Sequence, residues 1–177
     1  DRRRGAAVTD IPTLSTARLL LRPMTMADWP AYATFMASDR ARYMGGPFDR
    51  RGAWGMFCHD IALWPLMGNG AVMIEDRTTR AGLGQVGINS GPLFPEPELG
   101  WLVYPEAEGR GIAHEAASAL RDWAFGTLGL STLVSYDDLS NSRSCRLAER
   151  LSGTLVPLAA RQDAEDLVYR HPRPHNI

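Results

Sequence analysis

Residues 98–120, ELGWLVYPEAEGRGIAHEAASAL, join an apolar run, two glycines and a second run with a different period. The first run, 99–105, is rich in aromatic and β-branched residues, which is typical of a strand covered on both faces. From residue 113 onward, alanine, leucine and tryptophan recur on one helical face, which predicts a helix. Gly109 and Gly111 therefore lie in a turn that leads from a strand into a helix.

This turn is a candidate anion site. The first N–H groups of a helix lack intrahelical partners, and the helix dipole adds positive potential there. Glycine has no β-carbon, so a phosphate can approach the backbone closely. Arg110, between the two glycines, adds a charged donor. The same pattern also fits a tight turn that binds nothing. The residues around the turn must therefore distinguish an anion site from a simple turn.

Two common phosphate motifs are excluded. The P-loop pattern G-x-x-x-x-G-K-[ST] is absent. A dinucleotide fingerprint, G-x-G-x-x-G/A, needs a small residue where this chain has His114. The spacing therefore disfavours a nucleotide-dependent oxidoreductase.

The rest of the chain alternates between strand and helix patterns. We expect helices from residue 28 and at 51–66, 112–125 and 141–153, and strands at 18–23, 71–76, 84–89, 99–105, 131–137, 154–158 and 165–170. This order predicts a mixed α/β sheet in one domain, 14–171, between flexible tails at 1–13 and 172–177. The strands on either side of the 112–125 helix should be parallel, with a right-handed crossover.

The composition and charge of the chain exclude some classes of protein. With 177 residues, 45% of them hydrophobic, the chain is long enough for one substantial core. A net charge of −1 argues against a broad nucleic-acid surface, and no apolar stretch is long enough for a membrane span. Cys58 and Cys145 are expected to be reduced thiols rather than a disulfide, the alternative that two cysteines leave open. Reduced thiols fit a cytoplasmic location, as does the lack of a signal-like segment. The four histidines show no metal-ligand spacing, so no metal is expected: His59, His114, His171 and His175.

Residues 98–101, 108–113 and 115–116 resemble the coenzyme A-binding segment of GNAT-superfamily N-acetyltransferases. The family has E-[LI]-G-[YW] on a strand, a Q/R-x-x-G-x-G/A loop and an alanine-rich helix. The resemblance is strongest to the branch that acetylates N-terminal alanine or serine of ribosomal proteins. A second motif follows in register, because NSRSCRLAERLSG at 141–153 is similar to N-x-x-S-x-x-x-A-E-[RK]-x-G, with Ser152 inserted. The likeness spans roughly residues 16–170.

The resemblance implies a GNAT-like acyl-CoA N-acyltransferase fold and acetyl transfer from acetyl-CoA to a primary amine by direct attack. The acceptor would be a protein N-terminus or a small molecule, and the protein a monomer or homodimer. In the catalytic step, Glu98 would take the proton of the amine, and Ser144 would hydrogen-bond the leaving thiolate. The residues implied in cofactor binding are Trp101, Leu102, Val103, Gly109, Arg110, Gly111, Ile112, Ala113, His114, Asn141 and Ser144.

Simpler roles stay open for these residues. Asn141 also suits a plain helix cap, Ser144 a solvent-facing position and Glu98 a surface carboxylate at a strand end. Tyr104 and Tyr136 are further acid candidates or core aromatics.

The chain departs from the family in two places. Glu108 stands where Gln or Arg is usual, and residues 153–170 lack the aromatic-rich hairpin that often forms the acceptor site. A CoA-binding sensor or scaffold without catalysis is therefore the alternative.

Overall fold

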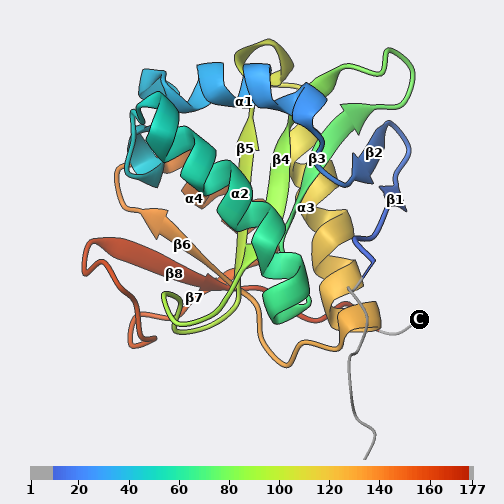
Figure 1. Ribbon diagram of the computed structural model, residues 1–177. Helices are drawn as coiled ribbons and strands as arrows, with labels where there is room; N and C mark the ends of the chain where they lie inside the picture. Colours follow the sequence, from blue (N-terminus) through green and yellow to red (C-terminus); the bar gives the residue numbers. More distant parts are fainter. Residues whose placement is uncertain (1–9, 176–177) are drawn as a thin grey trace, which may run out of the picture.

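The computed structural model describes residues 10–175, and residues 1–9 and 176–177 lie outside the described part. The predicted tails at 1–13 and 172–177 lie partly outside the described residues, and their described parts, 10–13 and 172–175, contain no helix or strand. A mixed sheet of eight strands forms the centre of the described part, in the order β1-β2-β3-β4-β5-β6-β8-β7 (Figure 1). The strands are β1 (Leu14–Ser15), β2 (Leu19–Arg22), β3 (Ala71–Asp76), β4 (Gly82–Asn89), β5 (Glu98–Val103), β6 (Val134–Asp138), β7 (Thr154–Leu155) and β8 (Asp166–Arg170).

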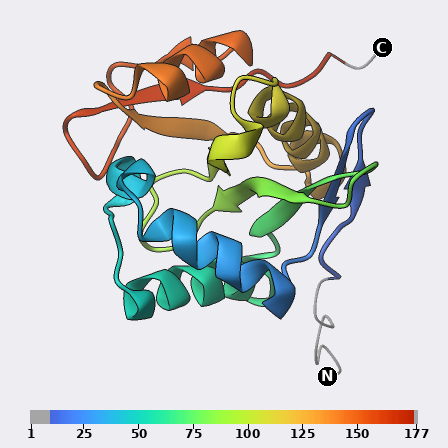
Figure 2. The same ribbon diagram turned by 90° about the horizontal axis from the view of Figure 1, so that it is seen from above.

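Helices cover both faces of this sheet. α1 (Trp29–Met36) and α2 (Arg50–Met67) lie on one face, and α3 (Ile112–Trp123) and α4 (Ser142–Arg150) lie on the other (Figure 2). Short turns of helix extend these elements: η1 (Met26–Asp28), η2 (Asp39–Met44), η3 (Pro105–Ala107) and η4 (Ala124–Leu128). The arrangement confirms the predicted single domain with a GNAT-like mixed α/β sheet.

Each face of the sheet has its own hydrophobic cluster. On the α3 face, Ala116, Ala117 and Leu120 are fully buried against the sheet, and the small alanines let the helix approach closely. On the α1 and α2 face, Tyr32 and Phe57 pack in one cluster with residues of β3 and β5, their ring centroids 5.2 Å apart. Burying a side chain such as Phe57 stabilises the fold by about 2–3 kcal/mol.

The sequence patterns located most elements, although some differ in extent or in surroundings. The strand expected at 154–158 is only the two residues of β7. The helix after the glycine turn ends through the π-helical turn η4 at a left-handed Gly129, one of the two glycines that mark its end in the sequence. Trp54 recurs with Phe57 and Leu63 in the predicted 51–66 helix, which indicates an apolar stripe, but Trp54 is 41% exposed whereas the other two are buried. Asp28 stands where the sequence predicts a helix cap, but it makes no side-chain cap to α1, because its carboxylate accepts hydrogen bonds from Arg22 and from the Thr25 N–H. β1 and η2 were not predicted.

β5 and β6 form the one parallel pair among the described strands, as the crossover rule predicted. Their register consists of a single pair, Glu98 with Val134, after which the two strands diverge. By contrast, β5 pairs with β4 along its whole length, from Glu98 to Val103. The divergence leaves a wedge in the sheet that opens toward the carboxyl ends of β5 and β6.

Candidate active site

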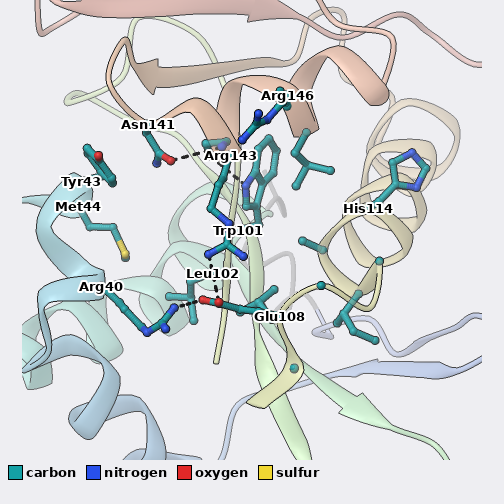
Figure 3. A pocket seen from close by; sticks show the side chains of 18 of the residues that line it. Arg40, Tyr43, Met44, Trp101, Leu102, Glu108, His114, Asn141, Arg143 and Arg146 are labelled. Carbon is teal, nitrogen blue, oxygen red and sulfur yellow. Dashed lines mark hydrogen bonds and ion pairs between the residues drawn. The ribbon is translucent and has the colours of Figure 1, made fainter. Parts of the chain in front are cut away.

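A pocket of about 530 Å³ lies where this wedge opens. Its walls come from η2 on one side, from α4 on the other, and from β5 and the glycine turn between them (Figure 3). Segments distant in sequence, 40–44, 101–114 and 141–150, therefore meet in one cavity. Of the predicted cofactor residues, all but Arg110 line it: Trp101, Leu102, Val103, Gly109, Gly111, Ile112, Ala113, His114, Asn141 and Ser144.

The N-terminus of α3 reaches this pocket without a cap. Gly111 occupies the cap position with φ of +74°, and no side chain accepts from the first turn. The first intrahelical bond runs from the Glu115 N–H to the Gly111 carbonyl, 3.1 Å. The N–H groups of residues 111–114 consequently have no intrahelical acceptor, and the helix dipole adds positive potential to them. This is the geometry of an anion site.

Left-handed backbone explains both glycines of the turn. Gly109 has φ of +73° and Gly111 of +74°, a region that side chains other than glycine rarely adopt. A β-carbon at Gly109 would meet no atom within 4 Å, and one at Gly111 would meet only the Arg18 Nη2, at 3.6 Å. Open space therefore lies above the backbone on the side where a ligand phosphate would approach.

The edge of β5 offers main-chain groups to the wedge. The Tyr104 N–H donates to the Leu83 carbonyl of the β4 segment, 2.8 Å, so even-numbered residues of β5 bond toward β4. Backbone groups alternate along a strand, and those of Trp101 and Val103 face β6. Because β6 has diverged at this level, the N–H groups of these two residues face the wedge rather than a partner strand.

Ser144 connects the pocket to a buried acid. Its hydroxyl oxygen accepts from the Trp101 indole Nε1–H at 3.1 Å, and the hydroxyl group lies near the buried Asp137. Burial raises the pKa of Asp137 to about 6, while the nearby Ser144 hydroxyl opposes that rise. Ser144 is half-buried, so it is not the simple solvent-facing serine that the sequence left open.

Asn141 is the N-cap of α4. Its side-chain oxygen accepts from the Ser144 N–H at 3.3 Å, so the capping role is present, and its NH₂ group is the part left to reach a ligand. Asn141 also lines the pocket.

Substitutions separate these two roles of Asn141. Asn141→Ala should lower stability by about 1 kcal/mol, whereas Asn141→Ser keeps a capping oxygen and should stay within a few tenths. If the NH₂ group also binds the cofactor, both variants should lose about fivefold in CoA affinity. Thermal melts and calorimetry measure the two effects. Full CoA affinity in Asn141→Ser would leave Asn141 as a cap only.

Glu98 lies at the base of the wedge, outside the pocket lining, where β5 and β6 still pair. It accepts from the Asn89 Nδ2 at 3.1 Å and from the Tyr136 backbone N–H. Burial is the main cause that raises its pKa to about 7. The residue as a whole is half-buried. A carboxyl group with this pKa can exchange a proton at neutral pH.

Three predicted side chains have other surroundings. The Arg110 guanidinium extends toward Asp76, 3.6 Å away, and does not line the pocket, so this geometry does not support its side chain as a phosphate donor. Tyr104 is buried, and its hydroxyl has no hydrogen-bond partner among residues 10–175. The Tyr136 hydroxyl accepts from the Glu96 N–H at 3.1 Å. Burial raises the pKa of both tyrosines, which disfavours their ionised forms.

Sequence reasoning missed the arginines of the pocket. Five line it, two from η2 and three from one face of α4: Arg40, Arg42, Arg143, Arg146 and Arg150. The spacing of three and four residues along α4 is a signal that could have indicated a basic stripe. Glu108, the unusual carboxylate, pairs with Arg40 and with Arg143 across the pocket.

The described residues contain neither a metal-ligand cluster nor a membrane-spanning helix. No cluster of three or more His, Cys, Asp or Glu side chains that could hold a metal ion occurs in residues 10–175. Within the same part of the chain, none of the helices is both long and apolar enough to span a bilayer. Cys58 and Cys145 are free, as predicted.

An uncapped helix start, a glycine turn with open space above its backbone and a split between two parallel strands form a site with room for an acyl-CoA-type cofactor. Residues 18–154 match the acetyltransferase (GNAT) domain family. The acetyltransferase from Agrobacterium tumefaciens is 58% identical, with a TM-score of 0.90 over 96% of this chain and 99% of that one. The chain therefore belongs to the GNAT acetyltransferases, and it is an acetyl-CoA-dependent acyltransferase.

More distant structures share the fold. The ribosomal-protein-S5-alanine acetyltransferase from Vibrio fischeri is 15% identical, with a TM-score of 0.67 over 94% of this chain and 98% of that one. Spermidine N-acetyltransferase from Vibrio cholerae, solved with CoA and spermine, is 17% identical, with a TM-score of 0.67 over 88% and 94%. The names of these two proteins give an alanine of a ribosomal protein and a polyamine as acceptors, so the fold alone leaves the acceptor open.

Proposed function

We propose that this GNAT enzyme transfers an acetyl group from acetyl-CoA to a primary amine by direct attack, with both substrates bound at once. The observation that carries the proposal is the uncapped N-terminus of α3, which opens on an arginine-lined pocket beside the divergence of β5 and β6. A diphosphate fits the free N–H groups of residues 111–114. The pantetheine arm fits the free main-chain groups of Trp101 and Val103.

Bound acetyl-CoA supplies the thioester, and the chain supplies the rest. Glu98, near pKa 7, accepts the proton that the attacking amine must lose, directly or through a water. A backbone N–H of β5 donates to the thioester oxygen as negative charge develops on it. Ser144 lies in the pocket and offers its hydroxyl to the departing thiolate.

A titration and a turnover assay test the proposal together. Calorimetry measures CoA binding, and release of free thiol from acetyl-CoA measures transfer to a panel of N-terminal peptides and small amines. We expect CoA binding and turnover with at least one acceptor class. Binding without turnover on any acceptor would contradict the catalytic proposal and favour a sensor or scaffold.

Ser144→Ala should lower kcat about tenfold while CoA binding changes little. The hydroxyl acts on the thiolate, which is a tolerable leaving group even without help, so the loss is smaller than for removal of the base. Ser142→Ala is the matched control, because Ser142 is exposed on the same helix and does not line the pocket. Equal kcat values for the two variants would remove Ser144 from the mechanism.

A further inference from the structure

Glu108 occupies the centre of the basic pocket. It follows η3 and precedes Gly109, so its backbone begins the phosphate-binding turn. One carboxylate oxygen pairs with the Arg40 Nη1 of η2, and the other lies 3.0 Å from the Arg143 Nη1 of α4 (Figure 3). The side chain is only 24% exposed, although the two arginines are 42% and 66% exposed. A single carboxylate therefore connects the two opposite walls.

The charge around it is strongly unbalanced. Five arginines line the pocket, and Glu108 is the one carboxylate among its lining residues. The unpaired N–H groups at the start of α3 add further positive potential at the same place. Without a ligand anion, Glu108 is consequently the group that supplies negative charge to these arginines.

Two physical roles fit such a bridge. In the first role, Glu108 is a structural strut that holds η2 and α4 at a fixed separation, and its loss would deform the pocket. In the second role, Glu108 is a placeholder that pairs with the arginines only until a more strongly charged anion binds. Ion pairs of exposed arginines contribute about 0–1 kcal/mol each, which makes a poor strut. A phosphate carries more charge than a carboxylate and matches the guanidinium fork equally well, so it competes effectively.

We infer that Arg40 and Arg143 form a phosphate subsite, and that Glu108 fills this subsite until a phosphate group of the cofactor displaces it. The inference rests on the proposed function, since it deepens the cofactor site. It assigns binding roles to two arginines from η2 and α4 and gives the unusual Glu108 a function as an internal competitor. The ligand chemistry is a phosphate, either the diphosphate or the 3′-phosphate of CoA.

Removal of the competitor should strengthen binding. Glu108→Gln keeps the shape of the side chain and removes its charge, so CoA affinity measured by calorimetry should rise about threefold to tenfold. Damage to a strut would weaken binding instead. Glu106→Gln is the matched control, because Glu106 is exposed two residues away and makes no ion pair within residues 10–175. Its affinity should stay within about twofold of wild type.

Substitution of either arginine should lower CoA affinity, in contrast to substitution of Glu108. In the Glu108→Gln background, Arg40→Gln and Arg143→Gln should each lower CoA affinity about tenfold, because a charge-assisted contact to phosphate is lost. Arg51→Gln, an exposed arginine of α2 outside this pocket, should have no such effect. Dephospho-CoA assigns the phosphate: an equal loss with both ligands indicates the diphosphate, and a loss confined to CoA indicates the 3′-phosphate.

Unchanged or weaker CoA binding in Glu108→Gln would overturn the inference, as would unchanged binding in both arginine variants. Thermal melts of each variant confirm that it is folded. A wild-type protein that binds no CoA at all would instead overturn the proposed function, so the two failures are distinguishable.

Discussion

Glu98→Gln should lower kcat by about 100-fold or more, with CoA affinity unchanged. The amide keeps the size of the side chain and can still accept from Asn89, but it cannot take a proton from the ammonium form of the acceptor. General-base catalysis contributes about 10²–10⁴-fold in enzymes. Thiol release at saturating acetyl-CoA measures kcat, and calorimetry with CoA measures the affinity.

The pH dependence makes this test specific to the base. Because burial raises the pKa of Glu98 to about 7, wild-type kcat should rise with pH. This rising limb of the pH profile should reach half of its maximum near pH 7. The variant should lack this limb. A variant with wild-type kcat and the same pH profile would contradict the assignment.

Stability should change in the opposite sense to activity. The folded-state pKa of Glu98 lies above its ordinary value of 4.5, so its ionisation is more costly in the folded protein than in the unfolded chain. The protein therefore loses stability as pH rises from about 4.5 through 7. Glutamine never ionises, and Glu98→Gln should raise the melting temperature more at pH 8 than at pH 5. A lower melting temperature at pH 8 would indicate that the carboxylate is structural.

Gly111→Ala should lower CoA affinity about tenfold to 100-fold. The added β-carbon has room in the free protein, where the nearest atom is the Arg18 Nη2 at 3.6 Å. It occupies the space that a diphosphate needs to reach the N–H groups of the turn, and each lost hydrogen bond to a charged group costs about 1.5–3 kcal/mol. Calorimetry with CoA measures the change.

Gly129→Ala is the matched control for backbone strain. Gly129 has φ of +75°, almost the value at Gly111, and a β-carbon there meets no atom within 4 Å. Both substitutions should therefore cost about 1–3 kcal/mol of stability through the left-handed backbone. Only Gly111→Ala should lose CoA affinity. Equal affinities in the two variants would contradict a phosphate site at the turn.

Local patterns in the sequence predicted the part of the site that is local. The glycine turn, α3 and the cap at Asn141 depend on neighbours within a few residues, and each was located correctly. The parallel pairing of β5 with β6 followed from the handedness of the crossover. The resemblance to a family supplied the cofactor, which composition and spacing could not.

Long-range contacts explain what the sequence missed. Arg40 and Arg143 are more than one hundred residues apart, and only the packing of η2 and α4 around the open wedge brings them to the same carboxylate. Arg110 lies within the turn, but its guanidinium extends toward Asp76 at the end of β3. No local pattern in the sequence indicates this partner. The raised pKa of Glu98 depends on burial at the base of the wedge, which strand spacing alone does not give.

A crystal structure of the protein with CoA tests most directly whether the start of α3 holds the cofactor. The N–H groups of residues 111–114 should lie about 2.7–3.2 Å from diphosphate oxygens, with the pantetheine arm alongside Trp101 and Val103 in the wedge. A diphosphate bound elsewhere, with these four N–H groups still unpaired, would contradict the account.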